Sequence, residues 1–296
     1  VDSTQGWINT MDSTSNVRAT SFVTATVSGA CNAITTSGDY KIATFKGPGT
    51  FCVSCGGSAG GSNTVDYFVV AGGGSGGTAN GGFGAGAGGA GGFRLSNATC
   101  MSAPQTSPLA SPTALPVSVQ GYPIAVGGGG AAFSSPDQSD GNVGENSTFS
   151  TITSAGGGYG GGGTTSSNSN GGAGGSGGGS WGCNPGSGCG GAGNTPPVAP
   201  PQGQNGGGRG PGDNGGSGGG GASAVGSDVG PPSTAGLGGA GSYVVQTGFA
   251  GCNGTPGPVP GARYFSGGGT GAASSGPYCG SVGGGGTGGA GGTDPG

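Results

Sequence analysis

The stretch TVDYFVVAGGGSGGTANGGFGAGAGGAGGF, residues 64–93, decides the fold that the sequence predicts. It opens with β-branched and aromatic residues from Val65 to Ala71, which is typical of a buried strand, and passes without a break into glycine. The same order of an apolar run followed by a glycine tract returns in three later segments, residues 122–130, 147–163 and 262–269. The sequence therefore predicts one unit, a strand that continues into a glycine rod, used several times.

Glycine supplies 87 of the 296 residues, close to the fraction found in collagen. Collagen needs glycine at every third position, because only glycine fits at the axis of its triple helix. Between Gly72 and Gly92 the glycines fall in all three frames, which excludes collagen. Glycine with 20 prolines is also typical of disordered linkers, but only 5% of the residues are charged. We expect ordered packing, because an uncharged glycine tract is poorly solvated unless its amides are paired.

An extended helix with three residues per turn offers that pairing. It has no internal hydrogen bonds, so its N–H and C=O groups must find partners on neighbouring rods. We predict a mainly β and irregular fold with almost no α-helix. An N-terminal β-rich region, residues 1–62, precedes a glycine-rich module of polyglycine II rods and short strands, residues 63–296.

Several local elements follow from pattern. Strands are expected at residues 21–28, 115–119, 122–126 and 242–246. Residues 39–53 predict a hairpin that turns at residues 46–49. Residues 134–146 predict a turn-rich loop, and residues 195–202, TPPVAPPQ, predict a stiff proline spacer.

The cysteines are even in number and spread along the chain: Cys31, Cys52, Cys55, Cys100, Cys183, Cys189, Cys252 and Cys279. Apolar burial is scarce, so we expect disulfides or oligomerisation to add stability, at about 2–4 kcal/mol per bridge. Disulfides in turn predict an oxidising, extracellular setting. The connectivity stays open. Cys52 and Cys55 also match a redox or zinc motif, but no helix follows and no second close pair exists, so structural disulfides are favoured.

Other functional classes are excluded or disfavoured. The net charge of −4, with scattered basic residues, excludes a nucleic-acid partner, and no apolar run is long enough for membrane insertion. The absence of histidine removes the usual general base, so we expect no enzyme, no cofactor and no metal. Four residues could offer oxygen ligands for calcium, but their spacing fits a solvated turn better: Asp137, Asp140, Asn142 and Glu145. The chain begins at Val1, so we expect a processed chain or part of a longer one.

Two sets of surface candidates remain. Three sequons would be glycan sites in a secreted eukaryotic protein, although chance occurrence is favoured: Asn97, Asn146 and Asn253. Four aromatic residues could stack on a carbohydrate, although packing is favoured: Tyr159, Trp181, Phe265 and Tyr278.

A family resemblance covers nearly the whole chain. The segments GDYKIATFKGPGTFCV (38–53), NTVDYFVVAGGGSGG (63–77), LPVSVQGYPIAVGGGG (115–130) and GNTPPVAPPQGQNGG (193–207) resemble a glycine-rich module of bacteriophage tail-fibre and appendage proteins. The resemblance implies packed polyglycine II helices, a place on the virion surface and a structural role. It also implies contact with a host-surface receptor or glycan. Separately, exposed rod amides and strand edges favour lateral pairing, so we expect copies of the chain itself as partners. The eight cysteines depart from this cysteine-poor module and favour maturation outside a reducing cytoplasm.

The sequence as a whole predicts a non-enzymatic structural protein that forms or tips an extended extracellular fibre, a phage tail fibre or related virion appendage in the first instance. Two alternatives stay open. One is a subunit of a self-assembling secreted filament, and the other is an adhesin that recognises its receptor through surface loops.

Overall fold

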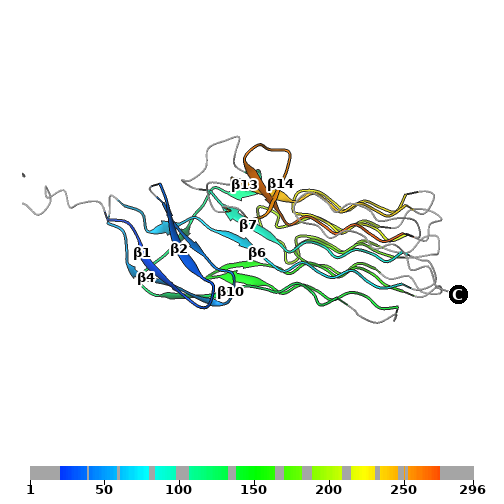
Figure 1. The fold of residues 1–296 in the computed structure, drawn as a ribbon, viewed down its shortest axis with the longest axis horizontal. Coiled ribbons are helices and arrows are strands. Elements are labelled where there is room, and N and C mark those ends of the chain that lie inside the picture. Colours follow the sequence, from blue (N-terminus) through cyan, green and yellow to red (C-terminus); the bar gives the residue numbers. More distant parts are fainter. Residues whose placement is uncertain are drawn as a thin grey trace, which may run out of the picture.

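The molecule is elongated, with its strands gathered at one end and its glycine-rich segments running side by side to the other (Figure 1). The computed structural model describes residues 21–38, 40–58, 61–79, 84–97, 107–132, 138–163, 170–181, 189–208, 215–230, 234–245, 250 and 253–273. No α-helix occurs within these ranges, so the mainly β and irregular fold is confirmed. The same ranges contain no helix with the length and apolarity needed to cross a bilayer.

The largest sheet is antiparallel and has five strands, in the spatial order β1 (Thr24–Ser28), β4 (Gly49–Cys55), β10 (Gly121–Ala125), β11 (Ser147–Phe149) and β12 (Ile152–Ser154). Its buried face is aromatic: the ring of Phe51 lies 5.8 Å from that of Phe149, and Tyr122 and Val53 are buried beside them. Because β4 and β10 pair, the chain before residue 62 and the chain after it share one sheet.

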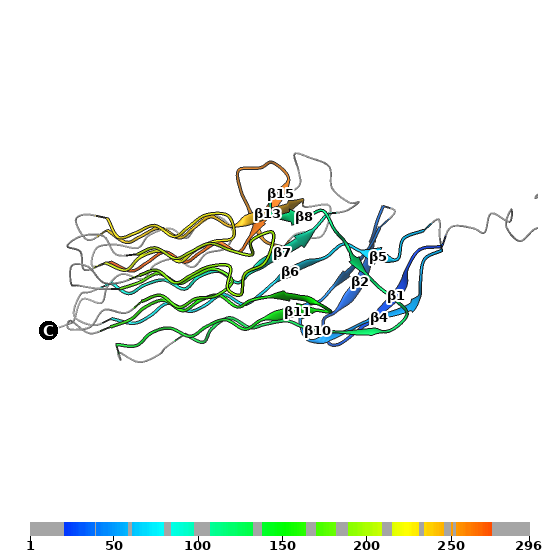
Figure 2. The ribbon, with the colours of Figure 1, turned by 180° about the vertical axis from the view of Figure 1, so that it is seen from behind.

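Smaller sheets surround this one. They comprise the pair β2 (Ala33–Ser37) and β3 (Tyr40–Thr44), the pair β5 (Thr64–Val65) and β9 (Leu115–Pro116), the group β6 (Phe68–Val70), β7 (Phe93–Ser96) and β8 (Ala110–Ser111), and the group β13 (Ser242–Val245), β15 (Ala262–Phe265) and β14 (Thr255–Pro256). From behind, the same strands again lie at one end of the molecule (Figure 2). Several of them run directly into glycine, as the sequence predicts.

The predicted hairpin over residues 39–53 is wrong. β3 pairs with β2, whereas β4 pairs with β1 and β10. A turn at Gly38, whose φ is 56°, closes the β2–β3 hairpin instead. The side-chain amide of Asn32 joins the turn between β1 and β2 to the turn between β3 and β4. Its Nδ2 donates to the Ser28 oxygen at 2.8 Å, and its Oδ1 accepts from the Lys46 N–H at 3.0 Å. These bonds hold the chain so that β4 enters the larger sheet.

The glycine segments pair with a period of three residues. Every third N–H of segment 71–78 donates to segment 84–92: Ala71 to Gly92, Gly74 to Gly89 and Gly77 to Gly86. The N–H groups one residue further on donate to segment 139–146 with the same period: Gly72 to Glu145, Ser75 to Asn142 and Thr78 to Ser139. A three-residue period between neighbouring chains is that of polyglycine II rods, so the predicted bundle is confirmed.

Successive rods alternate in direction, as the sense of their hydrogen-bond ladders shows. Rods that leave the strand end span residues 71–78, 126–132, 155–163, 176–181, 202–208, 224–230 and 266–273. Rods that return to it span residues 84–92, 139–146, 170–175, 189–194, 215–222 and 234–241. The predicted loop at residues 134–146 is therefore wrong over residues 139–146, which form a returning rod.

The proline spacer is also wrong, because residues 195–201 form a compact loop between a returning and an outgoing rod. Oδ1 of Asn194 accepts from the N–H groups of Val198 at 3.1 Å and Gln202 at 3.2 Å. Nε2 of Gln202 donates to the Pro196 oxygen at 2.9 Å, and the Gln202 side chain is fully buried. These side-chain hydrogen bonds close the loop where an extended proline segment would leave the backbone to water.

Candidate functional site

The centre of the bundle is the rod 84–92. Its backbone is hydrogen-bonded to five neighbouring rods, residues 71–78, 155–163, 176–181, 215–222 and 266–273. Its side chains are methyl groups only, at Ala85, Ala87 and Ala90, and each is at least 93% buried. Since no side chain larger than a methyl group extends from this rod, it is held by backbone hydrogen bonds in place of an apolar core.

This arrangement depends on close approach at glycine. A Cβ on Gly86 would meet the carbonyl oxygen of Gly179 in the adjacent rod. A Cβ on Gly128, at the exposed side of an outer rod, has its nearest atom 3.6 Å away, at Oε2 of Glu145. Whether a rod position can carry a side chain therefore depends on how closely the neighbouring backbone approaches it.

An apolar junction ties the shaft to the strands. Phe93, Leu95 and Val244 are fully buried there, together with Ala222 of rod 215–222 and Ala250. The rings of Phe68 and Phe265 meet edge to face, with centroids 4.9 Å apart. This cluster anchors the rods on the β region.

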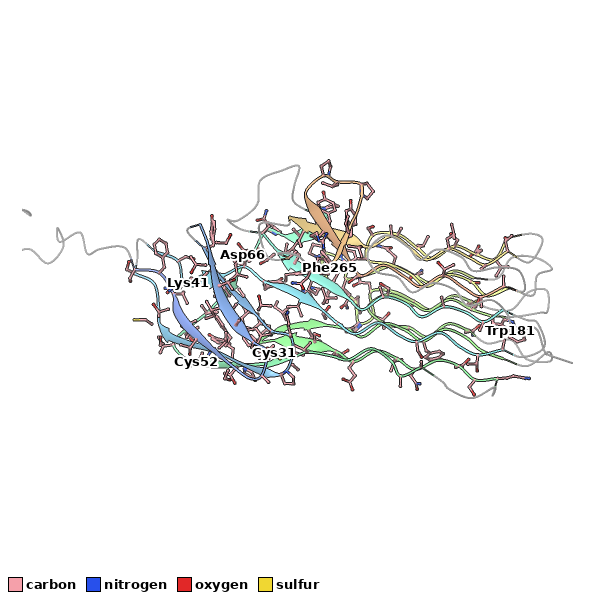
Figure 3. The ribbon with its side chains drawn as sticks, viewed as in Figure 1. Cys31, Lys41, Cys52, Asp66, Trp181 and Phe265 are labelled. Carbon is pink, nitrogen blue, oxygen red and sulfur yellow. The ribbon has the colours of Figure 1, made fainter. Side chains whose placement is uncertain are left out.

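A cavity of about 370 Å³ lies beside this junction, between the β2–β3 hairpin and the strands β6, β10 and β11. Its lining is mostly apolar, and its charged members are Lys41, Lys46 and Asp66, of which Figure 3 labels Lys41 and Asp66. The carboxylate of Asp66 accepts a hydrogen bond from the Ser96 hydroxyl at 2.9 Å. The lining offers room for an apolar group but supplies neither a nucleophile with a base nor a close pair of carboxylates.

Comparison with known families gives one result. A family model described as a glycine-rich domain matches residues 48–296. The chain belongs to this family. The match includes β4, every strand after it and all of the rods. Searches of curated proteins and of solved structures found no match.

The described cysteines all lie at the surface. Cys31, Cys52, Cys55 and Cys189 are exposed free thiols, and two of them are labelled in Figure 3. A register shift between β1 and β4 opposes Cys52 to Thr26 and Cys55 to Thr24, so both thiols lie on one solvent-facing side of the sheet. This CxxC pair lies in a strand, without the helix that a redox motif uses. The other candidates lie outside the described residues: Cys100, Cys183, Cys252 and Cys279. Disulfide pairing stays a prediction.

The predicted glycan acceptors within the domain take part in the fold. Oδ1 of Asn146 accepts from the Gly156 N–H at 2.8 Å, and Nδ2 of Asn253 donates to the Ala250 oxygen at 3.0 Å. Both residues are exposed, whereas Asn97 is half-buried. Their modification stays a prediction.

The preference for aromatic packing over carbohydrate stacking is confirmed for two residues. Trp181 is fully buried, near the far end of the rods in Figure 3, and Phe265 packs on Phe68. The ring of Tyr159 lies against Gly172, where a Cβ would meet it. Tyr278 lies outside the described residues.

Three acidic side chains of the domain pair with rod amides, a role that the sequence analysis missed. Oδ1 of Asp140 accepts from the Gly162 N–H at 2.9 Å, Oε2 of Glu145 from Gly128 at 3.1 Å and Oδ1 of Asp228 from Gly208 at 2.7 Å. Within the described ranges no three His, Cys, Asp or Glu residues gather as metal ligands would. A lone acid between glycine tracts is the sequence signal for this pairing.

Proposed function

We propose that this glycine-rich domain is a non-enzymatic structural protein that forms or tips an extended extracellular fibre, a phage tail fibre or related virion appendage. The observation that carries the proposal is the three-residue hydrogen-bond ladder, which ties the central rod to five others along the long axis. A shaft built this way resists bending, because bending must shear many backbone hydrogen bonds at once. It also leaves side chains free to vary at its surface.

Copies of the chain are the partners that this role requires. β1 is an edge strand of the five-stranded sheet, and an unpaired strand edge favours pairing with another chain. The outer rods likewise present backbone groups to the outside. We propose a homo-oligomer whose subunits associate through these edges, with the shafts projecting outward.

Electron microscopy of the purified chain tests this role. We expect discrete rods or small oligomers of uniform length that keep their shape in reducing agent, because the shaft itself is held by backbone hydrogen bonds. Shapeless particles with and without reducing agent would contradict a structural shaft. A variant with Cys31, Cys52 and Cys55 all replaced by serine is the control, since it removes exposed thiols without touching a rod.

A secreted filament is the second candidate, and the exposed thiols of the β region favour it. Cys52 and Cys55 face solvent on one side of the sheet, where they could cross-link copies. Long filaments that reducing agent or the triple serine variant shortens would support this candidate over a virion appendage. Saturable binding of a non-polymerising chain to host cells would instead favour the adhesin.

A further inference from the structure

The ring of rods around the central rod 84–92 is incomplete. Around the central rod, hydrogen bonds join each neighbouring rod to the next one. The order is 71–78, 155–163, 176–181, 215–222 and 266–273. Between the last rod, 266–273, and the first, 71–78, lies an open groove with a cavity volume of about 460 Å³. Five rods in contact order leave one place in a sixfold ring, so the groove is the position of one missing rod.

The floor of the groove presents hydrogen-bond donors. Successive N–H groups of a three-residue helix point in directions about 120° apart. In the central rod, Gly86 and Gly89 donate to rod 155–163 and Ala87 and Ala90 donate to rod 215–222. The third direction belongs to Ala85 and Gly88, which line the groove and whose N–H groups have no hydrogen-bond acceptor within the described part of the chain.

The walls of the groove present acceptors. In rod 71–78, the carbonyl groups of Gly74 and Gly77 accept no hydrogen bond from any described residue, and both residues line the groove. On the opposite wall the same holds for the carbonyl group of Gly267. A polyglycine II rod alternates N–H and C=O directions around its axis, so a rod in the groove would donate to both walls and accept from the floor. All of these groups are backbone, and none is charged.

The topology says which segment is missing. Every outgoing rod except the last, 266–273, is followed by a returning rod. That last rod forms one wall of the groove and runs away from the strand end. A returning rod placed directly after it would lie next to the groove with the opposite direction, as 84–92 lies next to 71–78.

The sequence contains the segment that fits. The motif GGAG occurs five times, and four of these lie in returning rods, at residues 88–91, 171–174, 190–193 and 238–241. The fifth is at residues 288–291, within the tract GGGGTGGAGG of residues 283–292. Ten residues at about 3.1 Å per residue span about 31 Å, enough to run the length of the groove. We propose that residues 283–292 form the missing returning rod and dock in this groove of their own chain.

Hydrogen exchange followed by NMR tests this docking, and the test does not depend on fibre formation. The full chain is compared with a chain that ends at Gly280. We expect the Gly88 and Ala85 amides to exchange at least tenfold more slowly in the full chain. The Gly86 and Gly89 amides, which are bonded to rod 155–163, are the internal control and should not change. Equal exchange at Gly88 in both chains would overturn the proposal.

Two further measurements keep the test decisive if the shortened chain is unstable. In the full chain, valine at both Gly289 and Gly291 should abolish the slow exchange at Gly88, because bulky side chains prevent close approach, whereas Asp294→Asn should leave it unchanged. A separate peptide of residues 280–292 should restore it to the shortened chain. Slow exchange that appears only as the protein concentration and the measured mass rise together would assign the groove to the tail of a second copy and overturn docking within one chain.

Discussion

Gly86→Ala is expected to destabilise the bundle by about 3 kcal/mol or more. The new Cβ would meet the carbonyl oxygen of Gly179 and would lie 2.9 Å from the Gly161 nitrogen, in two different rods. Overpacking of this kind costs about 1–3 kcal/mol. Moving the rods apart also weakens the hydrogen bonds of Gly86 with Gly161 (2.8 Å) and Gly77 (3.0 Å), at about 0.5–1.5 kcal/mol each. Chemical denaturation of the purified variant measures the loss.

Gly128→Ala is the matched control for this substitution. It also places a methyl group on a polyglycine II rod, but the nearest atom is 3.6 Å away, at a side-chain oxygen. We expect a change in unfolding free energy of less than about 1 kcal/mol, with a gain if alanine mainly restricts the unfolded chain. Equal losses at Gly86 and Gly128 would mean that backbone flexibility, and not close approach of the rods, explains the glycine content.

The rods could be predicted from the sequence, but their neighbours could not. An uncharged glycine tract must pair its amides, and that requirement alone leads to a bundle of three-residue helices. Which rod lies beside which depends on where each strand ends, and tracts dominated by glycine, such as 71–78 and 126–132, do not specify a partner. The GGAG motif of the returning rods is a partial exception, and it becomes meaningful only once the direction of each rod is known.

The errors have a common physical origin, which is that polar side chains bond to backbone groups outside their own strand, turn or rod. Asn32 fixes the connections around β2 and β3, so the hairpin expected over residues 39–53 does not form. Asp140 and Glu145 mark a solvated turn by local pattern, yet their carboxylates accept from glycine amides of other rods. Local sequence rules weigh such residues by their neighbours in the chain, whereas the amides that Asp140 and Glu145 bind lie at least seventeen residues away.

Gln202 is a second position where we expect a single substitution to destabilise the fold strongly. Its side chain is fully buried, Oε1 accepts from the Ala155 N–H at 2.8 Å, and Nε2 donates to the Pro196 oxygen at 2.9 Å. The amide thus joins the start of rod 155–163 to the loop at residues 195–201. A carboxylate in its place keeps the acceptor but turns the donor into a second anionic oxygen facing a carbonyl oxygen.

Gln202→Glu is therefore expected to lower the unfolding free energy at pH 7 by about 3 kcal/mol or more, because a buried charge without a partner is left behind. Burial and the facing carbonyl raise the pKa of the new carboxyl in the folded state above its unfolded value of about 4.3. Its stabilising form is then the protonated one, which can donate to Pro196. Stability should be restored below about pH 4 and lost as the pH rises through the folded pKa.

Gln204→Glu is the control for this pH dependence, since the residue lies two positions further on, is only half-buried and pairs through its backbone. Denaturation curves of both variants and of the parent chain are measured between about pH 3 and pH 8, the range in which a carboxyl with a raised pKa changes its protonation. These curves distinguish the outcomes. A pH-dependent loss confined to Gln202→Glu would establish that one buried amide holds the loop against the bundle. A loss at Gln202 that acid does not reverse would mean that the loop has repacked around the carboxylate, and that its closure does not depend on this hydrogen bond.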